Sequence, residues 1–221
     1  MNELKYFSRR ELLAIAVGGT SLSAAAAGLA QTREWTASLV VGPFYPQIKP
    51  LDQDADLTLI KGQREWSKGE VIHIAGRVVN LKGEPVRNAR IEVWQADANG
   101  RYSHPSDPNK APLDRNFQGY CSLRSDRDGQ YRFKTVKPGP YPGMRAGMRT
   151  PHIHLDIQAK TDRLVTQLFF PGEKLNETDV ILQSVRNESA RNTLFLKELP
   201  PSTGIGANET LFGWDCVLLT G

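Results

Sequence analysis

The stretch Pro151-His-Ile-His-Leu-Asp-Ile-Gln-Ala159 alternates between polar and apolar residues over most of its length. Such alternation predicts a β-strand with one buried face, because successive side chains of a strand point to opposite faces. His152 and His154 then lie on the same face, close enough for both imidazoles to bind one metal ion. The chain has only four histidines, and two of them lie in this short segment.

Similar short apolar runs follow one another along the rest of the chain. Clusters of Gly, Pro, Asn and Asp separate them, and the expected strands span residues 71–79, 89–95, 120–124, 131–135, 164–170 and 211–219. Seven short strands indicate an all-β fold, an antiparallel β-sandwich or barrel. The turn at 126–129 predicts a hairpin between its two flanking strands. One short helix is predicted over 178–187, with Asn176 or Thr178 as its cap, and the loop 100–119 is unusually long.

The composition is that of an ordinary globular protein. The chain has 221 residues, of which 39% are hydrophobic and 24% charged, with a formal net charge of +4. This length fits one domain with a substantial core. The positive charge is not gathered into a basic block, so the sequence gives no case for nucleic-acid binding. Cys121 and Cys216 could form a disulfide in an oxidising compartment, or they could remain two buried thiols.

The first thirty residues have the features of an export signal. Ser8-Arg-Arg-Glu-Leu-Leu13 is a twin-arginine motif, a weakly hydrophobic run follows it, and Gly28-Leu-Ala30 offers a signal-peptidase site. We therefore predict a signal peptide at 1–30, cleaved after about Ala30, and a periplasmic or exported protein. The run is short and polar for a membrane span, so an uncleaved anchor is the lesser alternative and no stable membrane partner is expected. Residues 31–70 are expected to form an extended arm, and residues 71–221 the β-domain.

Tyrosines are the nearest oxygen donors for a metal held by His152 and His154. Tyr141 lies within Pro138-Gly-Pro-Tyr-Pro142, and Tyr102 lies at the start of the long loop. A tyrosine, whose free pKa is near ~10, coordinates only a metal that is acidic enough to remove its proton. Two imidazoles together with two phenolates therefore favour Fe(III) over Zn(II) or Fe(II). Alone, His-x-His is a weak signal, and Pro-Gly-Pro-Tyr-Pro is equally consistent with a rigid turn.

Five motifs in order carry a family resemblance. They span most of the chain beyond residue 40: Gly42-Pro-Phe-Tyr-Pro46, Ala89 to Tyr102, Pro138-Gly-Pro-Tyr-Pro142, Arg149-x-x-His-Ile-His154 and Thr166-Gln-Leu-Phe-Phe-Pro-Gly172. In these motifs the chain resembles the intradiol ring-cleavage dioxygenases, most of all the iron-bearing (beta) subunit of protocatechuate 3,4-dioxygenase. The resemblance implies a Greek-key, prealbumin-like sandwich with long active-site loops. It identifies residues 71–221 as the catalytic β-sandwich.

The resemblance also implies a site and a reaction. Non-haem Fe(III) would be bound by Tyr102, Tyr141, His152 and His154. Tyr141 would be displaced by the substrate and take up one of its protons, Arg149 would stabilise negative charge on the substrate ring, and Gln167 would line the pocket. The reaction would insert both atoms of O2 into a catechol and yield a cis,cis-muconate-type diacid through a cyclic anhydride.

The chain departs from protocatechuate enzymes at two positions. Gly143 and Met148 stand where those enzymes usually have tryptophan, which predicts a wider or differently lined pocket. Protocatechuate, catechol, hydroxyquinol and larger lignin-derived catechols all remain candidate substrates. The partner of this chain could be a second copy of itself or a related subunit without the ligands.

Two other functions compete with this interpretation. The chain could be a catalytically inactive, transthyretin-like sandwich module that binds an aromatic or carbohydrate ligand, although four intact ligands argue against that. It could also be a different metalloenzyme, such as a cupin with His-x-His and Fe(II) or Mn(II), but the glutamate and third histidine typical of cupins are not present. We expect His104 to be a loop residue near the mouth of the pocket, we assign no role to His73 on its strand, and we expect Trp94 and Trp214 in the core. Alone, Arg149 would more commonly be a surface salt-bridge partner.

Overall fold

The structure, a computed structural model, describes residues 33–143 and 147–220. The predicted signal peptide and its cleavage site therefore lie outside the described residues. From residue 33 to residue 70 the chain contains no helix or strand, only the isolated bridge between Asp56 and Lys134. No helix within the described residues has both the length and the apolar character needed to cross a membrane.

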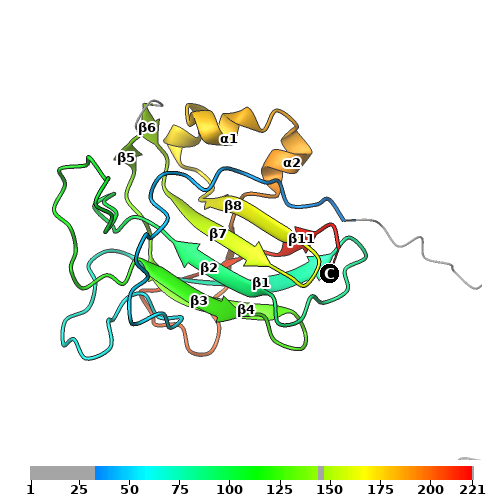
Figure 1. Cartoon of the computed structure of the whole chain (residues 1–221), viewed down its shortest axis with the longest axis horizontal. Coiled ribbons are helices and arrows are strands. Elements are labelled where there is room, and N and C mark those ends of the chain that lie inside the picture. The colour runs from blue at the N-terminus through cyan, green and yellow to red at the C-terminus, as the bar shows by residue number, and fades with distance from the viewer. Residues whose placement is uncertain (1–32, 144–146, 221) are drawn as a thin grey trace, which may run out of the picture. The chain divides into compact units, whose positions relative to one another are not determined.

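Most regular structure belongs to two sheets (Figure 1). The first has the order β11-β1-β10-β9, with β4 also paired to β1. Its strands are β1 (Val71–Asn80), β4 (Gln130–Val136), β9 (Lys197–Leu199), β10 (Thr210–Gly213) and β11 (Cys216–Leu218). The second has the order β3-β2-β7-β8, formed by β2 (Arg90–Trp94), β3 (Tyr120–Arg124), β7 (His152–Gln158) and β8 (Arg163–Phe169). A two-stranded ribbon joins β5 (Tyr141–Pro142) to β6 (Met148–Arg149).

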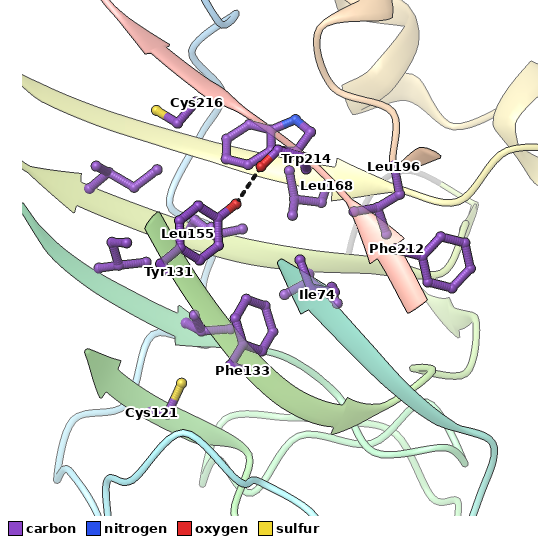
Figure 2. Close-up of a cluster of buried hydrophobic side chains, with 14 of the residues drawn as sticks. Ile74, Cys121, Tyr131, Phe133, Leu155, Leu168, Leu196, Phe212, Trp214 and Cys216 are labelled. Carbon is purple, nitrogen blue, oxygen red and sulfur yellow. Dashed lines mark hydrogen bonds between the residues drawn. The ribbon is translucent and has the colours of Figure 1, made fainter. Parts of the chain in front are cut away.

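The main core draws side chains from both sheets. Ile72 and Phe133 of the first sheet and Val93 and Leu155 of the second are fully buried in one cluster. Figure 2 shows part of this cluster, including Tyr131, whose hydroxyl donates a hydrogen bond of 2.8 Å to the carbonyl of Trp214. The core prediction for Trp214 is therefore confirmed.

Both cysteines lie in the main core as free thiols, Cys121 on β3 and Cys216 on β11. Figure 2 shows the two sulfur atoms well apart within the cluster. Of the two alternatives open from the sequence, the structure has the pair of buried thiols. Burial raises the pKa of each thiol well above its usual range, so neither is a reactive thiolate.

The all-β prediction is confirmed, but its antiparallel and hairpin details need correction. The strand β1 pairs in parallel with β10 and with β11, whereas its pairing with β4 is antiparallel. The turn at 126–129 forms, with a backbone hydrogen bond from Gly129 to Asp126, but it does not close a hairpin. It carries the chain from β3 in the second sheet to β4 in the first, because β4 pairs along seven residues of β1.

The single predicted helix is also wrong in extent. The structure has a 3-10 turn, η1 (Lys174–Glu177), followed by α1 (Val180–Ser184) and α2 (Glu188–Asn192). The cap of α1 is Asp179 rather than Asn176 or Thr178, and the helix ends where Val185 adopts an extended conformation. Figure 1 shows α1 and α2 beside β8, where Leu182 and Phe169 pack in a small separate cluster.

Candidate metal centre

The second sheet has two buried faces of different character. On β7, Ile153, Leu155 and Ile157 point into the main core, while His152 and His154 alternate with them and point to the opposite face. This outer face is buried as well, because the segment before β1 and the loop after β2 cover it. The cover includes Phe44, whose ring lies 4.7 Å from that of Tyr102 and 6.1 Å from that of Tyr141.

The four candidate ligands predicted from the sequence come together on this outer face. The Nε2 atoms of His152 and His154 lie 3.2 Å apart, and the Tyr141 hydroxyl lies 3.2 Å from His152 Nε2. The ring of Tyr102 stands at 89° to that of Tyr141, with 5.3 Å between the centroids. All four side chains are buried, with exposed fractions of 4% or less.

The hydrogen bonding of His152 fixes which of its nitrogens faces the cluster as an acceptor. Its Nδ1 lies 2.7 Å from the carbonyl oxygen of Thr150, and a carbonyl accepts, so Nδ1 carries the proton. The Nε2 lone pair is then directed at the cluster. Burial and the nearby charge of Arg149 lower the pKa of His152 to about 3, and burial, His152 and Arg149 lower that of His154 well below its usual range. Both imidazoles are therefore neutral, the state that binds metals.

The two tyrosines have an environment that favours a cation nearby. The Tyr102 hydroxyl is fully buried and has no hydrogen-bond partner among the described residues. Burial raises the pKa of Tyr102 well above its usual range and also raises that of Tyr141, which Arg149 partly opposes. Two neutral imidazole nitrogens and two phenol oxygens thus converge with an unsatisfied hydroxyl among them, and these donors fit an acidic metal ion. Among the described residues, no three His, Cys, Asp or Glu side chains are gathered to hold a metal, so a centre here requires the tyrosines.

Arg149 and Gln167 join the cluster from neighbouring strands. Arg149 lies opposite Tyr141 in the β5–β6 ribbon, and Gln167 on β8 lies opposite His154. The Arg149 Nη2 atom donates a 2.7 Å hydrogen bond to Gln167 Oε1, and its Nε donates a 2.8 Å bond to Asp179. Only 7% of Arg149 is exposed, so the alternative of a surface salt bridge is wrong.

A glycine turn sets the distance between the two tyrosine segments. The turn at 97–100 is closed by the side chain of Asp97, which accepts hydrogen bonds from the backbone amides of Asn99 and Arg101. Gly100 has φ +75°, and a Cβ added to it would lie 2.2 Å from the carbonyl oxygen of Pro140. Only glycine lets this turn pack against the proline segment that carries Tyr141.

Gly100→Ala is expected to destabilise the protein more than the matched substitution Gly62→Ala. Both positions have a positive φ, and alanine at either is expected to cost about 1–2 kcal/mol. At Gly62 a Cβ meets no atom within 4 Å, whereas at Gly100 the clash with Pro140 should add about 1–3 kcal/mol. Urea unfolding of the two variants measures the difference. Equal losses of stability would contradict the packing role of Gly100.

Sequence reasoning missed several side chains of the site. Trp94 was predicted to be core, and it is buried, but it lies on the outer face and stacks on the His154 ring at 4.8 Å and 11°. Its alternation with Ile91 and Val93 was the signal that placed it there. Glu92 lies two residues earlier on the same face and accepts hydrogen bonds from the hydroxyls of Tyr45 and Tyr120, both 2.8 Å, so it anchors the covering segment. No sequence feature indicated Asp179 as a site residue, apart from its position just before a short helix.

A recess and two histidines complete the surroundings. A cavity of about 260 Å³ is bordered by Tyr102, Trp94 and Lys49, so it adjoins the candidate ligands. The larger hollow of the described residues, about 1060 Å³, lies along β1, β4 and the last strands, and none of the candidate ligands lines it.

His104 lies in the long loop near Phe44, and His73 on β1 is bonded to Glu209, so neither joins the cluster.

Comparison with known proteins shows which family the chain belongs to. A family described as Dioxygenase matches residues 40–218. The chain is 44% identical over 149 residues to the protocatechuate 3,4-dioxygenase beta chain of Burkholderia cepacia, a match that covers 66% of this chain and 62% of that one. It is 30% identical over 210 residues to the hydroxyquinol 1,2-dioxygenase of Rhodococcus opacus, covering 88% of this chain and 65% of that one. The chain thus spans less than two thirds of either relative.

Solved structures share the fold at lower sequence identity. The dioxygenase domain of a dioxygenase–carbohydrate-binding protein fusion from Streptomyces sp. SirexAA-E superposes with a TM-score of 0.63 at 24% identity, covering 85% of this chain and all of that one. An intradiol ring-cleavage dioxygenase from Tetranychus urticae gives a TM-score of 0.63 at 18% identity, covering 84% and 95%. The family resemblance predicted from the five motifs is confirmed, and the chain belongs to the intradiol ring-cleavage dioxygenases.

Proposed function

We propose that this protein is an intradiol dioxygenase that uses non-haem Fe(III) to cleave a catechol. Tyr102, Tyr141, His152 and His154 would hold the ion. The observation that supports this most directly is the convergence of the two Nε2 atoms and the Tyr141 hydroxyl at 3.2 Å, beside the unpartnered hydroxyl of Tyr102. When bound, ferric iron would supply a Lewis acid that binds both catechol oxygens and makes the ring reactive toward O2.

Tyr141 would serve as the proton acceptor of the site. It is held by prolines on both sides, and its hydroxyl lies at the edge of the cluster beside His152. Phenolate and catecholate have comparable basicities. A proton can therefore pass from an incoming catechol hydroxyl to Tyr141 Oη at little cost in free energy. The second catechol proton would leave to solvent.

Arg149 would stabilise the negative charge that develops on the substrate ring. Its guanidinium is buried, and its charge adds to burial in lowering the pKa of His152 and of His154 and opposes the rise that burial causes in the pKa of Tyr141. A fixed cation in a buried site stabilises a developing anion more strongly than one in water. Gln167 would hold Arg149 in place through its amide oxygen while its amide nitrogen donates to the carbonyl of Val40.

The overall reaction adds both oxygen atoms of O2 to the substrate. The bond between the two hydroxyl-bearing carbons breaks as one atom of O2 enters to form a cyclic anhydride, and hydrolysis of that anhydride by the hydroxide that retains the second atom gives the cis,cis-muconate-type diacid. The identity of 44% to a protocatechuate enzyme against 30% to a hydroxyquinol enzyme favours a protocatechuate-like substrate. Gly143 packs closely against the stem of Arg149, since a Cβ there would lie 3.2 Å from Arg149 Cγ and 3.2 Å from the carbonyl oxygen of Gly147.

The assembly and location of the protein are part of the proposal. Relatives named as alpha and beta chains of protocatechuate 3,4-dioxygenase support an oligomer, either of this chain alone or with a related subunit. The two sheets around one core support the Greek-key, prealbumin-like sandwich. The twin-arginine motif supports export to the periplasm.

A visible spectrum of the aerobically purified protein tests the proposal. We expect a red-brown band from tyrosinate bound to Fe(III), which shifts when a catechol is added anaerobically. On admission of O2 the band should recover as a diacid appears, identified by mass spectrometry with both atoms of ¹⁸O2. A protein that stays colourless with added ferric iron would contradict the proposal and favour the binding module.

A further inference from the structure

Asp179 is a buried carboxylate that serves two parts of the chain at once. None of its surface is exposed. Its Oδ1 accepts hydrogen bonds of 3.0 Å from the backbone amides of Ile181 and Leu182, which caps α1. Its Oδ2 accepts from Arg149 Nε at 2.8 Å and from the amide of Thr150 at 3.0 Å. A cap needs only the first oxygen, so the second oxygen has a separate task.

The backbone of Thr150 links this carboxylate to His152. Its amide donates to Asp179, and its carbonyl accepts the Nδ1 proton of His152 at 2.7 Å. The Thr150 hydroxyl is bonded to Asn176 at 2.8 Å, and Asn176 is bonded in turn to the carbonyl of Phe170. The amide and the side chain of Thr150 are therefore both held, and the carbonyl that accepts from His152 Nδ1 is positioned with them.

The same oxygen also fixes the guanidinium of Arg149. With Nε bound to Asp179 and Nη2 bound to Gln167, two edges of the planar group are held. Such a two-point, charge-assisted arrangement sets the plane of the guanidinium as well as its distance from the site. A carboxylate at 179 thus controls both the cation and one imidazole of the cluster.

We propose that Asp179 is a positioning residue that orients the guanidinium of Arg149 and holds His152 in its Nδ1-protonated form. This inference rests on the proposed function for its effect on turnover. Its effect on the metal-free protein does not depend on that function. Ion-bound histidines in proteins commonly owe their orientation to such a partner on the other ring nitrogen, and loss of that partner weakens metal affinity or activity about 10- to 100-fold.

The substitution Asp179→Asn separates positioning from capping. The amide has one oxygen, so it cannot accept from the helix amides and also from Arg149 Nε and Thr150 N. If the oxygen stays on the helix, the NH2 group faces two donors, and the contact with Thr150 is lost. The matched control is Asp156→Asn. Asp156 is also buried on the second sheet and accepts from Arg163 Nε at 3.0 Å and Nη2 at 2.9 Å, but it contacts none of the four candidate ligands.

The first readout uses metal-free protein. In the wild type we expect a slowly exchanging Nδ1 proton on His152 and a protected Thr150 amide by NMR. In Asp179→Asn both should exchange faster, and in Asp156→Asn both should be unchanged. If Asp179→Asn does not fold, Asp179→Ser retains a cap oxygen and lacks the second acceptor, so it replaces the asparagine variant.

The second readout uses iron-loaded protein. We expect Asp179→Asn to lower kcat about 10- to 100-fold with little change in KM, and Asp156→Asn to retain wild-type turnover. Unchanged kcat together with unchanged NMR signals, even at a lower melting temperature, would overturn the proposal and leave a purely structural cap. If the wild type itself shows no turnover, the proposed function fails, and the metal-free readout still decides the role of Asp179.

Discussion

His152→Ala is expected to abolish stoichiometric iron binding. The substitution removes the nitrogen that lies 3.2 Å from both His154 Nε2 and the Tyr141 hydroxyl, so the remaining donors lose their common centre. Loss of an outer partner of a metal ligand already weakens a site about 10- to 100-fold, and loss of the ligand itself should exceed that. Iron per chain, measured by mass spectrometry after dialysis against a weak chelator, should fall from near one to background.

His104 provides the matched control for this prediction. His104 lies near the same site, where its ring is 5.8 Å from that of Phe44, which in turn packs against Tyr102. His104→Ala should therefore retain iron and the visible band. Far-UV circular dichroism of both variants checks that the fold persists. Full iron occupancy in His152→Ala, or equal losses in both variants, would contradict the assignment of His152.

The face that carries the site could be read from the sequence because a strand has a period of two residues. His152 and His154 alternate with Ile153, Leu155 and Ile157, and the structure keeps these two sets on opposite faces. The same rule applied to Ile91, Val93 and Trp94 would have moved Trp94 from the core to the histidine face. The two-residue period does not determine the register in which neighbouring strands pair. That Trp94 and Gln167 lie on either side of His154 follows from strand pairing, which the alternation leaves open.

The pairing of the strands and the second role of the helix cap Asp179 could not be predicted from the sequence, for a different physical reason. The parallel pairing of β1 with β10 joins segments more than a hundred residues apart, and local apolar patterns carry no information on that choice. The turn at 126–129 has the residues of a hairpin, yet the long β1 offers β4 a better partner than β3 does. Asp179 was missed because a cap is a local signal, whereas its second oxygen is bound by β6 and the residue after it.

Arg149→Gln is expected to slow turnover and to weaken the fold, and the two effects can be separated. Removal of one fixed group that stabilises developing negative charge typically lowers kcat about 100- to 1000-fold. The visible band should persist, because Arg149 is not among the four candidate ligands. The variant also leaves Asp179 without its cation, and an unpaired buried charge typically costs about 3–5 kcal/mol of unfolding free energy.

The double variant Arg149→Gln/Asp179→Asn distinguishes the electrostatic role from the structural one. Neutralising the orphaned carboxylate should restore part of the unfolding free energy, since no unpaired charge then remains buried. It should not restore kcat, because no cation faces the substrate ring. Arg163→Gln is the control. Arg163 also pairs with a buried carboxylate, that of Asp156, but its own side chain is 60% exposed and contacts none of the candidate ligands. Its loss should therefore leave turnover unchanged. Recovery of kcat in the double variant would show that Arg149→Gln acts only through stability and that its charge has no part in the reaction.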